Sequence, residues 1–222
     1  MDWILGHLDD IGGYTVQHAW LAGLPLLLGL AVAVPLGWLA RRRSWLYTPI
    51  VAGTGLLYTI PSLALFILMP LVLGTRILDE ENVIAAMTIY TVALLTRTVA
   101  DALGAVPDDV VAAATAMGLG PVRRLLTVEL PMAVPVIAAG LRVAAVSNVS
   151  IVSVAALIGV PQLGVLFTDG FYRDFLDPIV AGLVASALLA LLFDLAIVAL
   201  ARVLTPWHRT PAAARSGSEA PS

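Results

Sequence analysis

Long apolar runs alternate with short polar segments along most of this chain. A transmembrane helix needs about 20 mostly apolar residues to cross about 30 Å of hydrocarbon. The stretches that meet this requirement lie at about 18–40, 48–73, 83–100, 132–155 and 178–204. We therefore predict an all-α, polytopic membrane protein with about five transmembrane helices.

The two ends of the chain fall outside these stretches. Residues 1–17 form a segment that is too short and too acidic to span a membrane, so we predict that it lies at the interface. Residues 207–222 are rich in Pro, Ala and Ser and are predicted to be disordered. Residues 18–206 then make up a single membrane domain.

Composition supports this class and excludes several kinds of site. Hydrophobic residues make up 60% of the 222 residues and charged residues only 12%, whereas soluble domains carry about a quarter charged residues. Cysteine is absent and all 12 basic residues are arginine. The chain therefore has no thiolate metal site and lacks the lysine of a P-loop. Since the three histidines are scattered, we predict no metal and no cofactor on this chain.

The arginines predict an orientation, because cytoplasmic loops carry an excess of basic residues. The block Arg41–Arg43 directly follows the first stretch, which places that loop in the cytoplasm. Alternation then puts the N-terminus outside, residues 101–131 inside and the C-terminus inside. Arg123 and Arg124 fall on the cytoplasmic side of this topology.

A polar insert, VPDDVVAAATAMGLGPVRRLLTVELP, interrupts the apolar pattern near the middle of the chain. Pro107 and the acids after it predict the start of an amphipathic helix. Gly118 and Gly120 end it, and a second helix is expected from Pro121 to Pro131. The insert is either a connecting loop with surface helices or a docking element for a cytoplasmic partner.

This insert resembles the cytoplasmic signature of the permease subunits of bacterial ABC importers, a Glu-Ala-Ala, then Gly, then Ile-x-Leu-Pro pattern. The matching residues are Ala113, Ala114, Gly118, Leu130 and Pro131. Val128 replaces the isoleucine and Ala112 replaces the glutamate, although Asp108 lies one turn earlier on the same face. The resemblance implies a coupling loop at 101–131, whose first helix docks into a cleft on an ATPase subunit.

Three further segments, TIPSLALF (59–66), ALIGVPQLG (156–164) and RVLTP (202–206), resemble osmoprotectant permeases, which import glycine betaine, carnitine, choline and related compounds. The resemblance implies a type I permease fold in a bacterial plasma membrane and a dimer with an identical or homologous permease. It also implies an extracytoplasmic binding protein and cytoplasmic ATPase subunits that hold ATP and Mg, while this chain performs no catalysis. Two alternatives remain: an ABC permease for another solute such as an amino acid, and a stand-alone channel or secondary carrier.

Pro61 interrupts the second stretch and predicts a kink or an unwound turn at 58–62. Irregular backbone at membrane depth is tolerated where protein or a water-filled cavity surrounds it. Tyr58, Thr59 and Ser62 therefore either line a pathway or belong to a packing kink.

Polar residues within the other stretches raise similar questions. Asn148, in the fourth stretch, is either pathway lining or part of an interhelical hydrogen bond. Ionisable residues in or beside spans are costly and need a partner, and they are Arg97, Asp101, Glu129, Arg142 and Asp194.

The spacing of these ionisable residues suggests partners. Arg97 and Asp101 are four apart and are expected to pair with each other. Glu129 lies on an apolar helix face, and we hypothesise that Arg142 or Arg97 is its partner. Asp194 has no arginine nearby in the sequence, which favours a structural role over a cation site.

Overall fold

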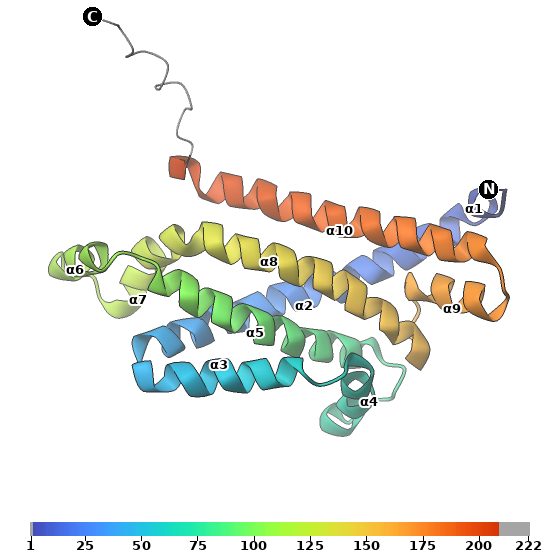
Figure 1. Ribbon diagram of the computed structural model, residues 1–222, viewed down its shortest axis with the longest axis horizontal. Coiled ribbons are helices and arrows are strands. Elements are labelled where there is room, and N and C mark those ends of the chain that lie inside the picture. The colour runs from blue at the N-terminus through green and yellow to red at the C-terminus, as the bar shows by residue number, and fades with distance from the viewer. Residues whose placement is uncertain (1, 209–222) are drawn as a thin grey trace, which may run out of the picture.

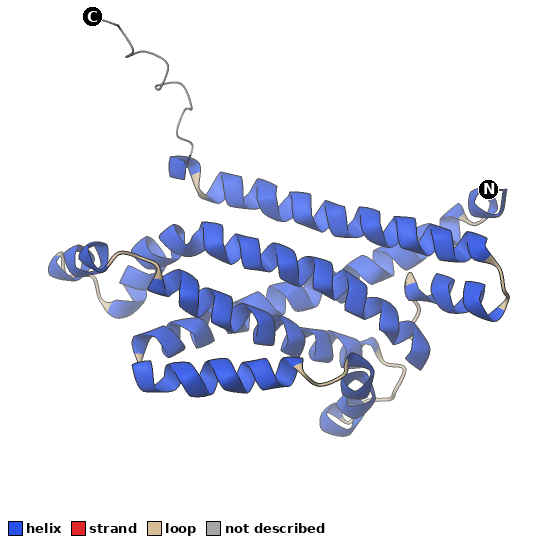
Figure 2. Cartoon of the chain, viewed as in Figure 1, coloured by secondary structure: helices blue, strands red, loops and turns tan. Residues whose placement is uncertain are grey.

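The computed structural model describes residues 2–208, and those residues form helices and short connections without any strand (Figure 2). The helices are α1 (Asp2–Gly6), α2 (Leu8–Arg42), α3 (Ser44–Tyr58), α4 (Ser62–Leu73), α5 (Glu80–Gly104), α6 (Asp108–Ala116), α7 (Pro121–Arg124), η1 (Leu125–Glu129), α8 (Leu130–Val152), η2 (Ser153–Ile158), α9 (Gly164–Tyr172), α10 (Leu176–Leu204) and η3 (Pro206–His208).

The long helices run side by side between two ends of the molecule (Figure 1). The short helix α6 lies at one end, where α2 and α10 also finish, whereas α1 and α9 lie at the opposite end (Figure 1). Four helical segments are long and apolar enough to cross a membrane, and a bent pair, α3 with α4, brings the number to five. The prediction of an all-α protein with about five crossings is confirmed.

The second predicted span is broken. Helix α3 ends at Tyr58, α4 begins at Ser62, and their axes differ by 104°. Pro61 occupies the N-cap position of α4 with φ −59° and ψ 133°. This ψ is extended and not helical, and proline has no N–H to continue the hydrogen bonds of α3. After the bend, α4 packs inward through Leu65 and Phe66. The interruption predicted at 58–62 is confirmed.

Helix α2 begins earlier than its apolar pattern suggests. It runs without a break from Leu8 to Arg42, 35 residues, which corresponds to about 52 Å at 1.5 Å per residue. The first helix therefore begins at Leu8 and not near His18, whereas the interfacial location of residues 1–17 stays a prediction. The glycines and acids before His18 continue the helix because each peptide group still finds its i−4 partner. The polarity of these residues indicates that the first turns of α2 extend beyond the hydrocarbon layer of the membrane.

A seam of small residues joins α2 to α5. Gly29, Ala33, Gly37 and Ala40 are buried along one edge of α2, and such spacing lets helix backbones approach closely. A Cβ on Gly37 would lie 2.7 Å from Cγ1 of Val99 and 2.9 Å from the backbone nitrogen of Ala100. The absence of a side chain there therefore sets the distance between the two helices.

The chain's C-terminal end is described only as far as His208. Trp207 and His208 belong to the short 3-10 helix η3, so the predicted disordered segment does not begin at 207. The rest of that prediction, 209–222, lies outside the described residues.

Candidate functional site: the α6 end of the bundle

Helix α6 is an exposed helix with a well-defined start and end. Asp108 and Asp109 occupy its first turn, where acids complement the positive end of the helix dipole. Ala114 is its only buried residue, so Ala112 and Ala113 face outward. Asp108 approaches Arg41 of α2 at 4.0 Å with its carboxylate almost wholly exposed. Such a contact adds little stability.

The turn after α6 is a Schellman motif. Gly118 N–H donates to Thr115 C=O at 2.9 Å and Leu119 N–H to Ala114 C=O at 3.2 Å, the pair of bonds that defines this cap. Gly118 has φ +81°, and no atom lies within 4 Å of the Cβ it lacks. The glycine is therefore required by backbone conformation and not by crowding.

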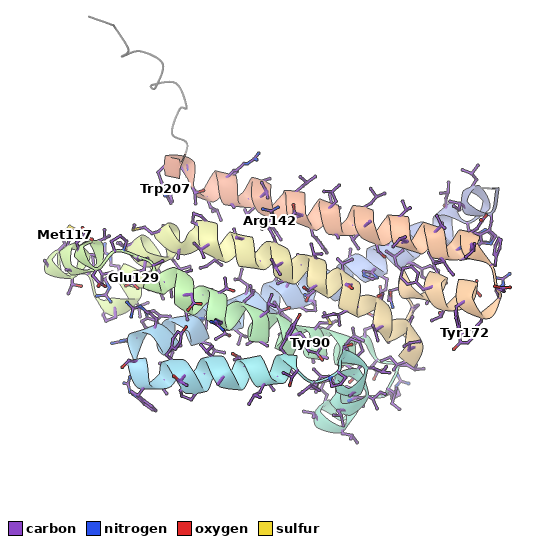
Figure 3. All side chains as sticks on the ribbon, viewed as in Figure 1. Tyr90, Met117, Glu129, Arg142, Tyr172 and Trp207 are labelled. Carbon is purple, nitrogen blue, oxygen red and sulfur yellow. The ribbon has the colours of Figure 1, made fainter. Side chains whose placement is uncertain are left out.

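The buried acid Glu129 pairs with Arg124. Nε of Arg124 donates to Oε1 of Glu129 at 2.6 Å, and Nη1 of the same arginine donates to Oγ1 of Thr115 at 2.7 Å. The hypothesis that Arg142 or Arg97 is the partner of Glu129 is wrong. Arg97 pairs with Asp101 and Arg142 with Asp194, and an arginine from the insert itself reaches Glu129. In Figure 3, Glu129 lies between the α6 tip, marked by Met117, and the bundle.

The helix after Gly120 also departs from expectation. It does not end at Pro131: α7, η1 and α8 are continuous, and Leu125–Glu129 forms a π-turn. Leu130 N–H donates to Leu125 C=O, a spacing of five residues. Because proline lacks an N–H and its ring crowds the carbonyl four residues earlier, a wider turn ahead of Pro131 lets the helix pass through the proline.

Arg97 and Asp101 form the predicted pair within α5, with Nε to Oδ2 at 3.5 Å. Asp101 has a second partner that the sequence did not suggest. The hydroxyl of Tyr47 on α3 donates to Oδ1 of Asp101 at 2.6 Å. These three side chains join α3 to α5 near the α6 end of the bundle.

Arg142 and Asp194 form a bidentate pair between α8 and α10, with N–O distances of 2.5 and 3.0 Å. Figure 3 shows Arg142 between these two helices. Of the two roles weighed for Asp194, this pair favours the structural role over a cation site. Its partner could not be found from sequence spacing, because 52 positions separate the two residues.

The broken span presents several polar groups. Tyr58 is 40% exposed, Thr59 and Pro61 are exposed, and Ser62 is half-buried. The hydroxyl of Tyr90 donates to the carbonyl of Ile60, which satisfies a backbone group that the break leaves free. Pathway lining by Tyr58, Thr59 and Ser62 stays a prediction.

Asn148 joins three helices. Its side chain is buried, and Nδ2 donates to Ala22 C=O on α2 at 3.2 Å and to Oγ1 of Thr91 on α5 at 3.0 Å. Of the two alternatives that the sequence left open, this favours the interhelical hydrogen bond.

A buried polar network at the α9 end was not recognised from the sequence. His18 and Gln162 are both fully buried, with Nδ1 of His18 3.0 Å from Oε1 of Gln162. Gln162 also accepts from Gly164 N–H at 2.5 Å and donates to Ser153 C=O at 3.1 Å. The glutamine in ALIGVPQLG was the only available signal.

Among residues 2–208, no group of three His, Cys, Asp or Glu residues could hold a metal ion.

Comparison with known proteins adds to this geometry. Residues 26–209 match the family described as binding-protein-dependent transport system inner membrane component. The chain belongs to this family. Its members are membrane components of transport systems and not enzymes, in agreement with the helical bundle and the exposed α6 loop.

Individual relatives agree with the family. The chain is 38% identical over 212 residues to the osmoprotectant import permease protein OsmW of Salmonella typhimurium, covering 93% of this chain and 98% of that one. It is 31% identical to OpuCD, the glycine betaine/carnitine/choline transport system permease protein of Bacillus subtilis, covering 88% and 86%. A chain of the MetNI methionine ABC transporter in an inward-facing conformation superposes with TM-score 0.81 at 19% identity, covering 90% and 98%. This likeness shows a type I ABC permease fold.

Proposed function

We propose that this chain is the permease subunit of an ATP-driven importer of osmoprotectants such as glycine betaine, carnitine or choline. The observation that supports the coupling role most directly is α6, an exposed helix capped by Gly118 and bonded to the base of α8 through Arg124. The solutes named for OsmW and OpuCD support the substrate class.

The proposed partners follow from the surfaces that the chain leaves open. Ala112, Ala113 and Met117 are exposed at the α6 loop and offer a small apolar face to a cytoplasmic ATPase subunit that binds ATP and Mg. Helix α3 packs on α2 and α5 without any fully buried residue, so its remaining surface is open to neighbours, including a second permease of the same or a homologous chain. With the N-terminus outside and the α6 loop in the cytoplasm, α1 and α9 lie on the outer side of the membrane and face the binding protein.

The solute itself is proposed from the relatives and not from a cage on this chain. Quaternary ammonium groups are recognised by aromatic faces through cation–π attraction, and aromatic residues make up 7% of this sequence. Selection then falls to the external binding protein, and this chain provides the path. An amino acid is the second candidate. The methionine transporter supports only the fold, because its identity to this chain is 19%.

Uptake of labelled glycine betaine at high osmolarity tests the proposal, in cells that express this chain with its neighbouring transport genes. Gly118→Val is compared with Gly120→Val, because neither glycine has an atom within 4 Å of the added Cβ and only Gly118 has positive φ. We expect ATP-dependent uptake that Gly118→Val abolishes and Gly120→Val largely retains. If the cells take up an amino acid and none of glycine betaine, carnitine and choline, the substrate is an amino acid and not an osmoprotectant. Equal loss in both variants would remove the assigned role of the α6 turn.

A further inference from the structure

The ion pair between Arg124 and Glu129 crosses the π-turn η1, and its spacing is unusual. In an α-helix, side chains three or four positions apart are neighbours, whereas residues five apart point in directions about 140° apart, since each residue turns the helix by about 100°. The π-turn brings Arg124 and Glu129 together at 2.6 Å. The pair can therefore exist only while η1 keeps its wide turn.

The same arginine reaches α6. Its Nη1 donates to Oγ1 of Thr115 at 2.7 Å, and Thr115 is anchored in α6 by donating to Val111 C=O. Among the other helices, α6 packs mainly against α7 and η1. Arg124 thus provides the polar connection between α6 and the base of α8.

The joint is not held by close packing. A cavity of about 160 Å³ lies beside Arg124 and Glu129, and Trp38, Arg41 and Val111 are among the residues that line it. Glu129 is only 8% exposed at its side chain and Arg124 only 23%. Because both side chains are largely buried, solvent and salt screen the ion pair little. The cavity leaves the position of α6 relative to α8 undetermined by packing, so the ion pair sets it.

We propose that Arg124 is a positioning residue that joins α6, η1 and α8 into one rigid lever. This inference rests on the proposed function, in which α6 receives the movement of an ATPase subunit. A displacement of α6 passes through Thr115 and Arg124 to Glu129, and from there into α8, which packs on α5 and α10. Without the link, α6 pivots about the glycine turn at 118–120 and the movement is lost.

The first test measures solute imported per ATP hydrolysed by the assembled transporter in liposomes. Thr115→Val removes one hydroxyl from an exposed site. Its matched control is Thr127→Val, because among residues 2–208 the Thr127 hydroxyl bonds only to Arg123 C=O, one turn earlier along the chain. Arg124→Gln is compared with Arg123→Gln, an exposed neighbour. We expect Thr115→Val and Arg124→Gln to lower the amount of solute imported per ATP hydrolysed several-fold in complexes that still contain the ATPase subunits. The controls should retain the wild-type ratio. The lever would be overturned if Thr115→Val and Arg124→Gln import as much solute per ATP hydrolysed as the wild type. It would also be overturned if import falls only in proportion to the loss of ATPase subunits from the complex.

A second measurement separates failure of the lever from failure of the proposed function. The chain has no cysteine, so spin labels can be placed at Met117→Cys on the α6 turn and Val143→Cys on α8, both exposed. In lipid bilayers we expect a narrow distance distribution that Thr115→Val broadens and Thr127→Val does not. Equal widths in both variants would contradict the lever even if transport is shown. A lack of ATP-dependent uptake by the wild type, with the expected widths, would contradict only the proposed function.

Discussion

Arg142 on α8 and Asp194 on α10 form a two-point ion pair, with Nε to Oδ1 at 2.5 Å and Nη2 to Oδ2 at 3.0 Å. Between Pro178 and Ala201, α10 carries no charged residue other than Asp194, and the helix lies on the outer side of the bundle (Figure 1). A charge near the centre of a membrane span costs about 2.5–3.5 kcal/mol on insertion scales. The pair therefore fixes the rotation of α10, because any other rotation separates the charges.

Removing one charge of the Arg142–Asp194 pair is expected to lower the stability of the protein more than removing both charges. We predict that Asp194→Asn or Arg142→Gln alone lowers the thermal unfolding temperature of the protein in lipid nanodiscs, because each leaves one charge without its partner. The double variant should recover a large part of the loss. Arg97→Gln is the control, since its pair with Asp101 is 71% and 51% exposed at the two side chains and should contribute little. Additive losses in the double variant would show that the two residues act separately.

Gly37 is expected to be sensitive to a single methyl group. Gly37→Ala places a Cβ 2.7 Å from Val99, so α2 and α5 must move apart, and overpacking of this kind costs about 1–3 kcal/mol. The matched substitution is Gly13→Ala in the same helix, where no atom lies within 4 Å of the added carbon. We predict lower yield and lower thermal stability for Gly37→Ala only. Equal stability of the two variants would show that the seam tolerates expansion.

Gln162 is expected to hold the segment between η2 and α9. Gln162→Leu leaves Gly164 N–H and Ser153 C=O without their partner, and an unsatisfied buried group costs about 1–3 kcal/mol. We predict faster hydrogen exchange at residues 153–165. The control is Gln17→Leu, because Nε2 of Gln17 is buried with no partner among the described residues. Gln17→Leu should be neutral or stabilising. Faster exchange at residues 153–165 in Gln17→Leu, with none in Gln162→Leu, would show that Gln162 does not hold this segment.

Pathway lining by the broken span can be tested by accessibility. The chain has no cysteine, so Tyr58→Cys, Thr59→Cys and Ser62→Cys each create a single thiol. We predict that a membrane-impermeant thiol reagent modifies these sites in the assembled transporter and that saturating glycine betaine slows the reaction. Leu191→Cys on α10 is the control, where a lipid-facing thiol should not react. Absence of reaction at all three sites would favour the packing-kink alternative.

Much of the architecture could be read from local patterns. Apolar runs of the required length identify the crossings because lipid offers no other partner for backbone groups. Pro61 predicts the broken span because proline has no N–H and weakens the helix there. Gly118 ends α6 because only glycine adopts φ +81° without strain. The pairing of Arg97 with Asp101 follows from one turn of helix. Each of these features depends on residues a few positions apart, or on the solvent that surrounds a whole segment.

Other features were decided only when the helices packed. The pairing of Arg142 with Asp194 and of His18 with Gln162 joins residues 52 and 144 positions apart, and no local pattern encodes which helix faces which. The partner of Glu129 was missed for a different reason. Arg124 is five residues away, a spacing that places the two on different faces of an α-helix, and only the π-turn ahead of Pro131 brings them together. The apolar pattern and its proline and glycine breaks determined the elements by themselves. Tertiary packing determined their rotations and charge partners, because these depend on distances that exist only after assembly.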